Sequence, residues 1–494
     1  MIPNQDILAD GIQAQSLLID PRVVLAFPGQ KHGGPLEYPF TVAMEWIWPG
    51  NYYASSLIRV ALAFLTGFLA AKLAFRLFPG TRTWALLLAM AVGPTIIHGL
   101  QLPGVWWLQP NYDMAWLLIT AGALTLAHAT RAPSDDAATS RRYLTAGAAG
   151  LLFGLGLFAH PVIILMAMPM ATLVVLVRRV DLRAGLVAFT GLLVAIVPAA
   201  VSYFVNDEVN VWDPSHKPFI SPEWLWSMGR TALGLDGIPD PFTALLPYAL
   251  GFSPTQTPFP GPVQTVAIGG VLLTCLIVLA TGIRSSVKHR TWLSPAAGLA
   301  ASWLVAGTTM VLFITSIDPV WHYSAGLSVL AWISIGALPS LINSRSIGIG
   351  ASVLAIVVFF TSTWAQNASY LSSLPTRAAT KAKTLEEWHS TAVALQERGV
   401  DVVYGSYADA IPIGYASNWG LRTITNKYNR FPLTDDELGK ATYVVAVRQD
   451  GDPGLGQDAL DDVRRTCQDL LTDLALAAGT YTLAECPTSL LAPG

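Results

Sequence analysis

The sequence predicts a polytopic α-helical membrane protein with a small extracytoplasmic α/β domain at its C-terminal end. Of the 494 residues, 53% are hydrophobic and only 12% are charged, whereas soluble globular domains contain about 25% charged residues. Long apolar segments recur up to about residue 366, and the 16 tryptophans suit a protein with two membrane–water interfaces. The net charge of −3 gives no indication of a nucleic-acid partner.

About nine segments are long and apolar enough to cross roughly 30 Å of hydrocarbon. They lie near residues 56–75, 84–99, 113–130, 144–158, 162–177, 185–205, 263–283, 295–316 and 324–366. We expect the last segment to form two spans, interrupted around Asn343-Ser344-Arg345. The transmembrane bundle is therefore predicted over residues 56–366, with nine or ten spans.

The basic residues predict the orientation of these spans. Among the short loops, arginine and lysine occur only in alternate ones, such as those with Arg76, Arg142 and Arg284, while the loops 98–111 and 317–323 contain none. Basic loops stay on the cytoplasmic side of a membrane. We therefore expect a multi-pass protein of the cytoplasmic (inner) membrane with three parts outside, namely residues 1–55, the long loop 206–262 and residues 367–494. Because no signal peptide precedes the outside N-terminus, we also expect a further transmembrane helix immediately before Ile2.

The pattern changes after residue 367. It predicts, in chain order, a helix at 384–397, strands at 400–404 and 441–447, a helix at 457–474 and a strand at 480–483. Helices that alternate with strands indicate a small α/β domain. Cys467 and Cys486 both lie in this domain, outside the membrane, where a disulfide is permitted. Their spacing leaves open whether they are bonded.

Three carboxylates stand out before the first span, in a segment expected to hold short interfacial helices. Asp6 and Asp10 are four residues apart, so a helix would place both on one face. A second interpretation makes Asp6 a helix N-cap and Asp10-Gly11 a turn. Glu37 follows a glycine–glycine–proline turn, where it either lines a site or is a solvated loop acid.

Several side chains at the outer ends of spans could contact an anionic lipid. Arg59 could hold a phosphate bidentately, or it could extend to the lipid headgroups. Asp113 is either a helix cap or part of a site wall. In the long loop 206–262, His216 and Lys217 are the best candidates for a phosphate contact. His322 lies in one of the outer loops that lack basic residues.

Several short motifs resemble those of one family. They are Gly34-Pro35-Leu36-Glu37-Tyr38-Pro39 after an acidic helix, Ser56-Leu57-Ile58-Arg59 and Pro110-Asn111-Tyr112-Asp113 opening two spans, and His160-Pro161 after a glycine-rich helix. Together they resemble the GT-C superfamily of membrane glycosyltransferases, in particular the dolichyl-phosphate-mannose and aminoarabinose transferase-like group. The fold class is thus expected to be GT-C-like.

The resemblance implies an enzyme that transfers a sugar, with inversion, from a polyprenyl-phosphate donor to a glycan, lipid or protein acceptor on the outer face of the membrane. It makes Asp6 the catalytic base, with Asp10 and Glu37 in support. The side chains assigned to the donor phosphate and substrate are Arg59, Asp113, His216, Lys217 and His322. A divalent cation, Mg²⁺ or Mn²⁺, is left open. The chain departs from the family pattern at Ile7, where many members carry a second acid, and at His322, where many carry an arginine.

Two other classes of protein remain as alternatives. A transporter or lipid flippase would be expected to show internal repeats and ionisable groups near the bilayer midplane. The sequence shows no clear repeat, and its ionisable groups gather at the outer ends of the spans. A non-catalytic GT-C relative, acting as a scaffold for envelope assembly, is the second alternative, since Ile7 replaces an acid.

Overall fold

A computed structural model describes most of the chain. The described residues are 5–19, 34–50, 52–78, 110–129, 136–160, 163–205, 261–289, 294–316, 327–338, 341, 345–418, 420–426, 440–450, 455–467 and 469–491. Contacts divide the chain into two compact units. The first unit comprises Met1–Ile58, Ser202–Asp213 and Ser373–Gly494, and the second comprises Arg59–Val201 and Pro214–Ser372.

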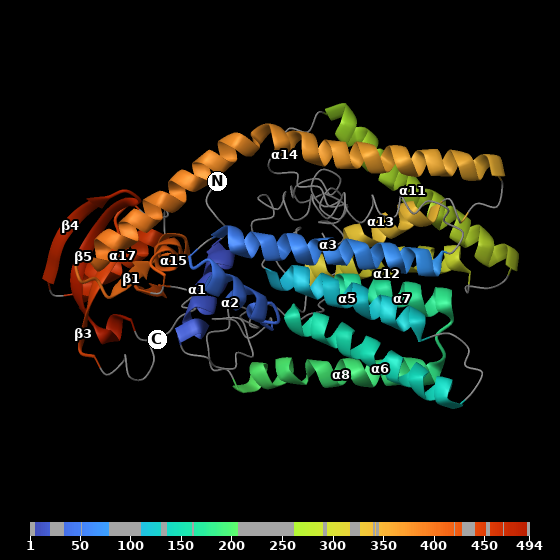
Figure 1. The fold of residues 1–494 in the computed structure, drawn as a ribbon, viewed down its shortest axis with the longest axis horizontal. Helices are drawn as coiled ribbons and strands as arrows, with labels where there is room; N and C mark the ends of the chain where they lie inside the picture. Colours follow the sequence, from blue (N-terminus) through green and yellow to red (C-terminus); the bar gives the residue numbers. More distant parts are fainter. Residues whose placement is uncertain are drawn as a thin grey trace. The chain divides into compact units, whose positions relative to one another are not determined.

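The second unit is a bundle of α-helices. Its helices, three of which (α3, α8 and α14) continue into the first unit, are α3 (Tyr52–Leu77), α5 (Pro110–His128), α6 (Asp136–Ala159), α7 (Ile164–Arg178), α8 (Leu182–Val205), α11 (Gly261–His289), α12 (Pro295–Ser316), α13 (Leu327–Ala337) and α14 (Arg345–Gln396). Helix α5 packs against α6 and α7, α7 packs against α12, and α12 packs against α11 (Figure 1). A helix occurs at every predicted apolar segment that the structure describes, while the segment 84–99 lies outside the described residues.

Small residues allow α6 and α8 to approach closely. A Cβ atom added to Gly150 of α6 would lie 1.7 Å from the carbonyl oxygen of Ala188 on α8. One added to Gly191 of α8 would lie 2.4 Å from the carbonyl oxygen of Gly147. Backbone contact across small residues is typical of helix pairs in membranes, where close packing replaces the hydrophobic effect.

Two described helices contain stretches long and apolar enough to cross a membrane, Leu57–Leu77 and Thr139–Ala159. Two shorter apolar helices span Ile164–Arg178 and Leu182–Pro198. The predicted bundle boundaries at residues 56 and 366, and the number of passes, stay predictions.

The first unit contains a five-stranded sheet in the order β2-β1-β3-β5-β4. The strands are β1 (Val402–Gly405), β2 (Arg422–Thr425), β3 (Thr442–Arg448), β4 (Asp469–Leu476) and β5 (Gly479–Pro487). Strand β1 is parallel to β2 and β3, and β5 is antiparallel to β3 and β4. The parallel pair β1–β2 requires a crossover connection, which α15 (Tyr407–Ala416) supplies.

The two faces of the sheet have separate cores because successive side chains of a strand point to opposite faces. Val403 faces the core that contains residues of α15, the end of α14 and α1 (Gln5–Ile19). Val402 and Tyr404 face the core under α17 (Leu455–Thr466), which the short helix η4 (Thr488–Leu490) also covers. The N-terminal helix α1 is therefore part of the core of the C-terminal domain.

The structure confirms most of the predicted elements of this domain. The predicted strands correspond to β1, β3 and β5, and the helix predicted at 384–397 is the last part of the 52-residue helix α14. The helix predicted at 457–474 is wrong after Thr466, because residues 469–476 form β4. This strand pairs with β5 through a hairpin that returns at Gly479, whose φ of +136° is suited to glycine. Helix α15 and strand β2 are further elements, beyond those that the sequence pattern predicts.

Cys467 and Cys486 form a disulfide. The bond links the residue after α17 to β5, and both cysteines are buried in the core under α17. The open question of their pairing is thus settled by the structure.

Candidate active site

Helix α1 (Gln5–Ile19) is buried over residues 8–16. Its apolar side chains Leu8 and Ile12 pack in the core of the C-terminal domain. Asp10 is also fully buried, at 0% exposure. Asp10 and Gly11 lie inside the helix, so the interpretation of this pair as a turn is wrong. Asp6 is the second residue of α1, and its side chain lies outside what the structure describes.

Glu37 immediately precedes α2 (Tyr38–Ile47) at its N-cap position. The Pro35 turn leads into the helix, and Pro39 in its first turn needs no backbone donor. The Glu37 side chain is 0% exposed and makes no cap hydrogen bond to the helix. Neither of its carboxylate oxygens has a hydrogen-bond partner in the described part of the chain. The interpretation of Glu37 as a solvated loop acid is therefore wrong.

Burial raises the pKa of Glu37 to about 8. The cause is desolvation, which disfavours the charged form of an acid. A buried carboxyl whose pKa is strongly raised is a candidate for functional chemistry, because catalytic acids and bases are often tuned in this way.

Glu45, in the last turn of α2, is a buried carboxylate that no motif in the sequence indicates. It is 1% exposed. Its Oε1 accepts a hydrogen bond from the Tyr415 hydroxyl at 2.9 Å. Its Oε2 accepts from Gln15 Nε2 at 3.1 Å and from the Gly50 backbone N–H at 2.9 Å. Burial raises the pKa of Glu45, and these hydrogen bonds oppose the shift.

The second unit holds a buried ion pair between two predicted site residues. Arg59 of α3 donates from Nε to Asp113 Oδ2 of α5 at 2.8 Å. The side chains are 7% and 1% exposed, so the interpretation of Arg59 as a headgroup-seeking residue does not hold. Arg59 Nη2 and Asp113 Oδ1 have no hydrogen-bond partner among the described residues. The pair is neutral overall, yet it keeps one donor and one acceptor available.

Tyr112, which precedes Asp113 in the sequence, stacks on the ring of His160. Their ring centroids are 3.9 Å apart, and both side chains are buried. The stack connects the start of α5 to the residue that follows α6. It fixes the turn of α5 that carries Asp113.

Three predicted site residues lie outside the described part of the chain, namely His216, Lys217 and His322. Their assignment to a donor phosphate stays a prediction. Within the described ranges, no group of three or more His, Cys, Asp or Glu side chains is arranged to hold a metal ion. The open question of a divalent cation therefore also stays a prediction.

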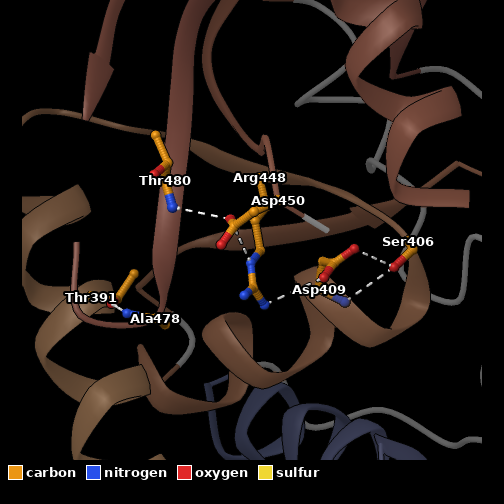
Figure 2. Close-up of polar contacts among 7 residues, drawn as sticks. All are labelled: Thr391, Ser406, Asp409, Arg448, Asp450, Ala478 and Thr480. Atoms are coloured by element: carbon orange, nitrogen blue, oxygen red, sulfur yellow. Dashed lines mark hydrogen bonds and ion pairs between the residues drawn. The ribbon is translucent and has the colours of Figure 1, made fainter. Parts of the chain in front are cut away.

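A second polar cluster lies in the C-terminal domain, at the carboxyl ends of β1 and β3 (Figure 2). Arg448 Nε and Nη1 contact Asp450 Oδ1 at 3.2 Å and Asp409 Oδ1 at 3.5 Å. Asp450 Oδ1 accepts from the Thr480 N–H at 3.1 Å, and Ser406 Oγ donates to Asp409 Oδ2 at 2.5 Å. These bonds tie β3, the β4–β5 hairpin and α15 together, so we interpret the cluster as structural.

The fold of the chain is the GT-C fold, as the resemblance in the sequence predicts. ArnT from Cupriavidus metallidurans in the apo state matches with a TM-score of 0.57 and 11% sequence identity. The same protein bound to undecaprenyl phosphate matches with a TM-score of 0.50 and 12% identity. Each match covers 100% of this chain and 95% of ArnT.

The oligosaccharyltransferase of Archaeoglobus fulgidus, in a complex with zinc and sulfate, matches with a TM-score of 0.45 and 12% identity. This match covers 90% of this chain and 64% of that protein. No protein-family model matches the chain, and no curated protein matches it by sequence.

Proposed function

We propose that this protein transfers a sugar, with inversion, from a polyprenyl-phosphate donor to an envelope glycan, lipid or protein. The observation that supports this function most is the likeness of the fold to ArnT over the whole chain, since one ArnT structure contains undecaprenyl phosphate. The transfer would occur at the outer face of the cytoplasmic membrane, where the orientation predicted from the basic loops places the N-terminal carboxylates.

Exposed apolar side chains support a membrane setting for the second unit. Helix α8 alone exposes Leu186, Phe189, Val194 and Val197 by between 54% and 58%. Contiguous apolar surface of this kind is rare on water-soluble monomers, and lipid would cover it. We therefore propose that the helices of this unit form a polytopic bundle, with more passes than the two long apolar stretches alone would give.

We propose Glu37 as the carboxylate base that takes the proton from the attacking acceptor hydroxyl. General-base catalysis is most effective when the pKa of the base lies near the working pH. The pKa of about 8 for buried Glu37 meets this condition. Asp6 and Asp10, four residues apart on α1, are the further catalytic candidates that the resemblance implies. Asp10 is buried, and it lies on the same helix as Gln15, which donates a hydrogen bond to Glu45.

We propose that Arg59 binds an oxygen of the donor phosphate. Its guanidinium is oriented by Asp113 through Nε, which leaves Nη2 to donate to a further group. Planar guanidinium groups suit phosphate oxygens. His216, Lys217 and His322 stay additional candidates for this contact, and omission of Mg²⁺ and Mn²⁺ from the assay would test the need for a cation.

The test is a transfer assay with the full chain purified into lipid. Polyprenyl-phosphate mannose and undecaprenyl-phosphate aminoarabinose serve as radiolabelled donors, with an extract of envelope glycans and lipids as the acceptor. We expect wild-type protein to release the label from one of these donors and Glu37→Gln to lose at least about 100-fold in rate, the usual contribution of a general base. Asp461→Asn, on the exposed surface of α17, is the control with an unchanged rate.

Two results would contradict the proposal. Wild-type rates in folded Glu37→Gln, Asp10→Asn and Asp6→Asn would exclude the carboxylate mechanism. Movement of a labelled lipid across the bilayer without loss of its sugar would favour the transporter or flippase alternative.

A further inference from the structure

Helices α1 and α2, which carry the N-terminal carboxylates, are attached to the C-terminal domain at one buried carboxylate. Glu45 of α2 accepts hydrogen bonds from Gln15 of α1 and from Tyr415 of α15. Tyr415 is 370 residues away from Glu45 in the sequence and is 2% exposed. These two bonds thus join three helices at a single side chain.

The ring of Tyr415 also packs directly on the backbone of α1. A Cβ atom added to Gly11 would lie 2.3 Å from Cε2 of Tyr415, so only glycine leaves room for the ring. Tyr415, Leu8 and Ile12 belong to one apolar core with Trp388 and Leu395 of α14. Tyr415 therefore sets the position of α1 through its ring and the position of α2 through its hydroxyl.

The contacts of Tyr415 and Glu45 lie only a few residues along α1 and α2 from the proposed catalytic side chains. Gly11 is the neighbour of Asp10, and Gln15 is little more than one turn further along α1. Glu45 is eight residues after Glu37, which corresponds to about 12 Å of helix. A shift of α2 at Glu45 would therefore move Glu37.

The buried carboxylate of Glu45 is not the residue that would make this position most stable. A buried charge loses its hydration, and well-packed apolar residues often replace buried charged groups without loss of stability. The two hydrogen bonds from Gln15 and Tyr415, in contrast, are directional and fix the geometry of the helices that make them. We propose that Glu45 and Tyr415 are positioning residues for sugar transfer, by which the C-terminal domain holds α1 and α2 in their working arrangement.

This inference rests on the proposed function, and the key variant is Tyr415→Phe. It removes one hydroxyl and leaves the ring packed on Gly11. The matched control is Tyr404→Phe, which removes a tyrosine–carboxylate hydrogen bond to Asp462 (3.4 Å) in the core on the other face of the sheet. Hydrogen exchange of the α1 backbone and transfer kinetics as a function of pH are measured for both variants and the wild type.

We expect Tyr415→Phe to lower kcat about tenfold, the effect of losing a hydrogen bond to a charged group, with the KM for the lipid donor unchanged. The acidic limb of its pH–rate profile should move to lower pH, because looser packing of α2 hydrates Glu37 and lowers its pKa. Amides of residues 8–16 should exchange faster than in the wild type. Tyr404→Phe should match the wild type in all three measurements.

Glu45→Gln provides a second measure of the same attachment. Its single amide oxygen can accept only part of the hydrogen bonds of the carboxylate, so we expect its kcat to lie below that of the wild type and its pH profile to move in the same direction as that of Tyr415→Phe. A normal pH profile in Glu45→Gln would overturn the positioning role of Glu45.

The outcomes separate this inference from the proposed function. If the wild type transfers sugar and Tyr415→Phe keeps its kcat and pH profile, the positioning role is wrong and the function stands. If the wild type transfers no sugar, the proposed function is wrong. The hydrogen-exchange rates of α1 then test only whether Tyr415 attaches α1 to the C-terminal domain. Equal exchange of α1 in Tyr415→Phe and Tyr404→Phe would then overturn the attachment too.

Discussion

Replacing Glu37 by glutamine should make the protein more stable at neutral pH and inactive at the same time. Glu37 is fully buried, and its pKa is raised from 4.5 to about 8. Below pH 4.5 the carboxyl is protonated in the folded and unfolded chains, so its titration costs no stability. Between pH 4.5 and 8 the unfolded chain loses the proton while the folded chain keeps it, so the free energy of unfolding falls as the pH rises.

The size of this effect follows from the shift. Each pKa unit corresponds to about 1.36 kcal/mol, so titration of Glu37 lowers stability by about 3 kcal/mol at pH 7 and by about 5 kcal/mol above pH 8. Glutamine resembles the protonated form and does not titrate. At about 2–4 °C per kcal/mol for domains of 150–250 residues, Glu37→Gln should melt on the order of 10 °C above the wild type at pH 7.

The assay is thermal unfolding of the purified protein at several pH values between 4.5 and 9. The melting temperatures of wild type and Glu37→Gln should coincide near pH 4.5 and diverge up to about pH 8. Glu397→Gln, which changes an exposed acid after α14, should follow the wild type throughout. Parallel curves for wild type and Glu37→Gln would refute the argument, because they would show that Glu37 is hydrated in the folded protein.

Three further predictions concern the framework of the two units. Replacing both Cys467 and Cys486 by alanine should lower the free energy of unfolding by about 3 kcal/mol, since the bond closes a loop over a separation of 19 residues; melting with and without reductant should show the same loss in the wild type and no effect of reductant in the variant. Arg59→Gln should destabilise the second unit by about 3–5 kcal/mol because it leaves Asp113 buried without its charge partner; combining it with Asp113→Asn should restore most of the melting temperature but not sugar transfer. Gly11→Ala should cost about 1–3 kcal/mol through overpacking against Tyr415, whereas Gly185→Ala in α8, with no atom within 4 Å of the added Cβ, should not lower the melting temperature.

Local pattern was sufficient to predict the helices of the bundle and three strands of the sheet. Apolar segments of membrane length and short runs such as Val402–Gly405 carry their own signal. The helix predicted at 457–474 extends wrongly over most of β4 (Asp469–Leu476), because this strand pairs only with β5, a contact that periodicity does not encode. Arg59 and Asp113 were identified separately, each as the start of a span, but nothing in either motif indicates that they form an ion pair.

Glu45 could not be found from the sequence for the same physical reason. It stands between Met44 and Trp46 in a short apolar helix, where no motif distinguishes it. Its function in the structure comes from Gln15 and Tyr415, which lie 30 and 370 residues away. Glu37 was found because a glycine–glycine–proline turn precedes it, yet its burial depends on packing that the turn does not specify.

The packing of α1 in the core of the C-terminal domain has a consequence for the order of folding. Leu8, Ala9 and Ile12 are fully buried against side chains that include Val403, Tyr415 and Tyr481. Residues so far apart in the sequence can meet only after nearly the whole chain has been synthesised, and such non-local contacts form slowly. Asp10 lies on α1, and Glu37 precedes α2, which packs against α1 and is hydrogen-bonded to Tyr415 through Glu45. The tuned pKa of Glu37 should therefore appear only in the completed protein, which links the proposed chemistry to the final step of folding rather than to the helical bundle alone.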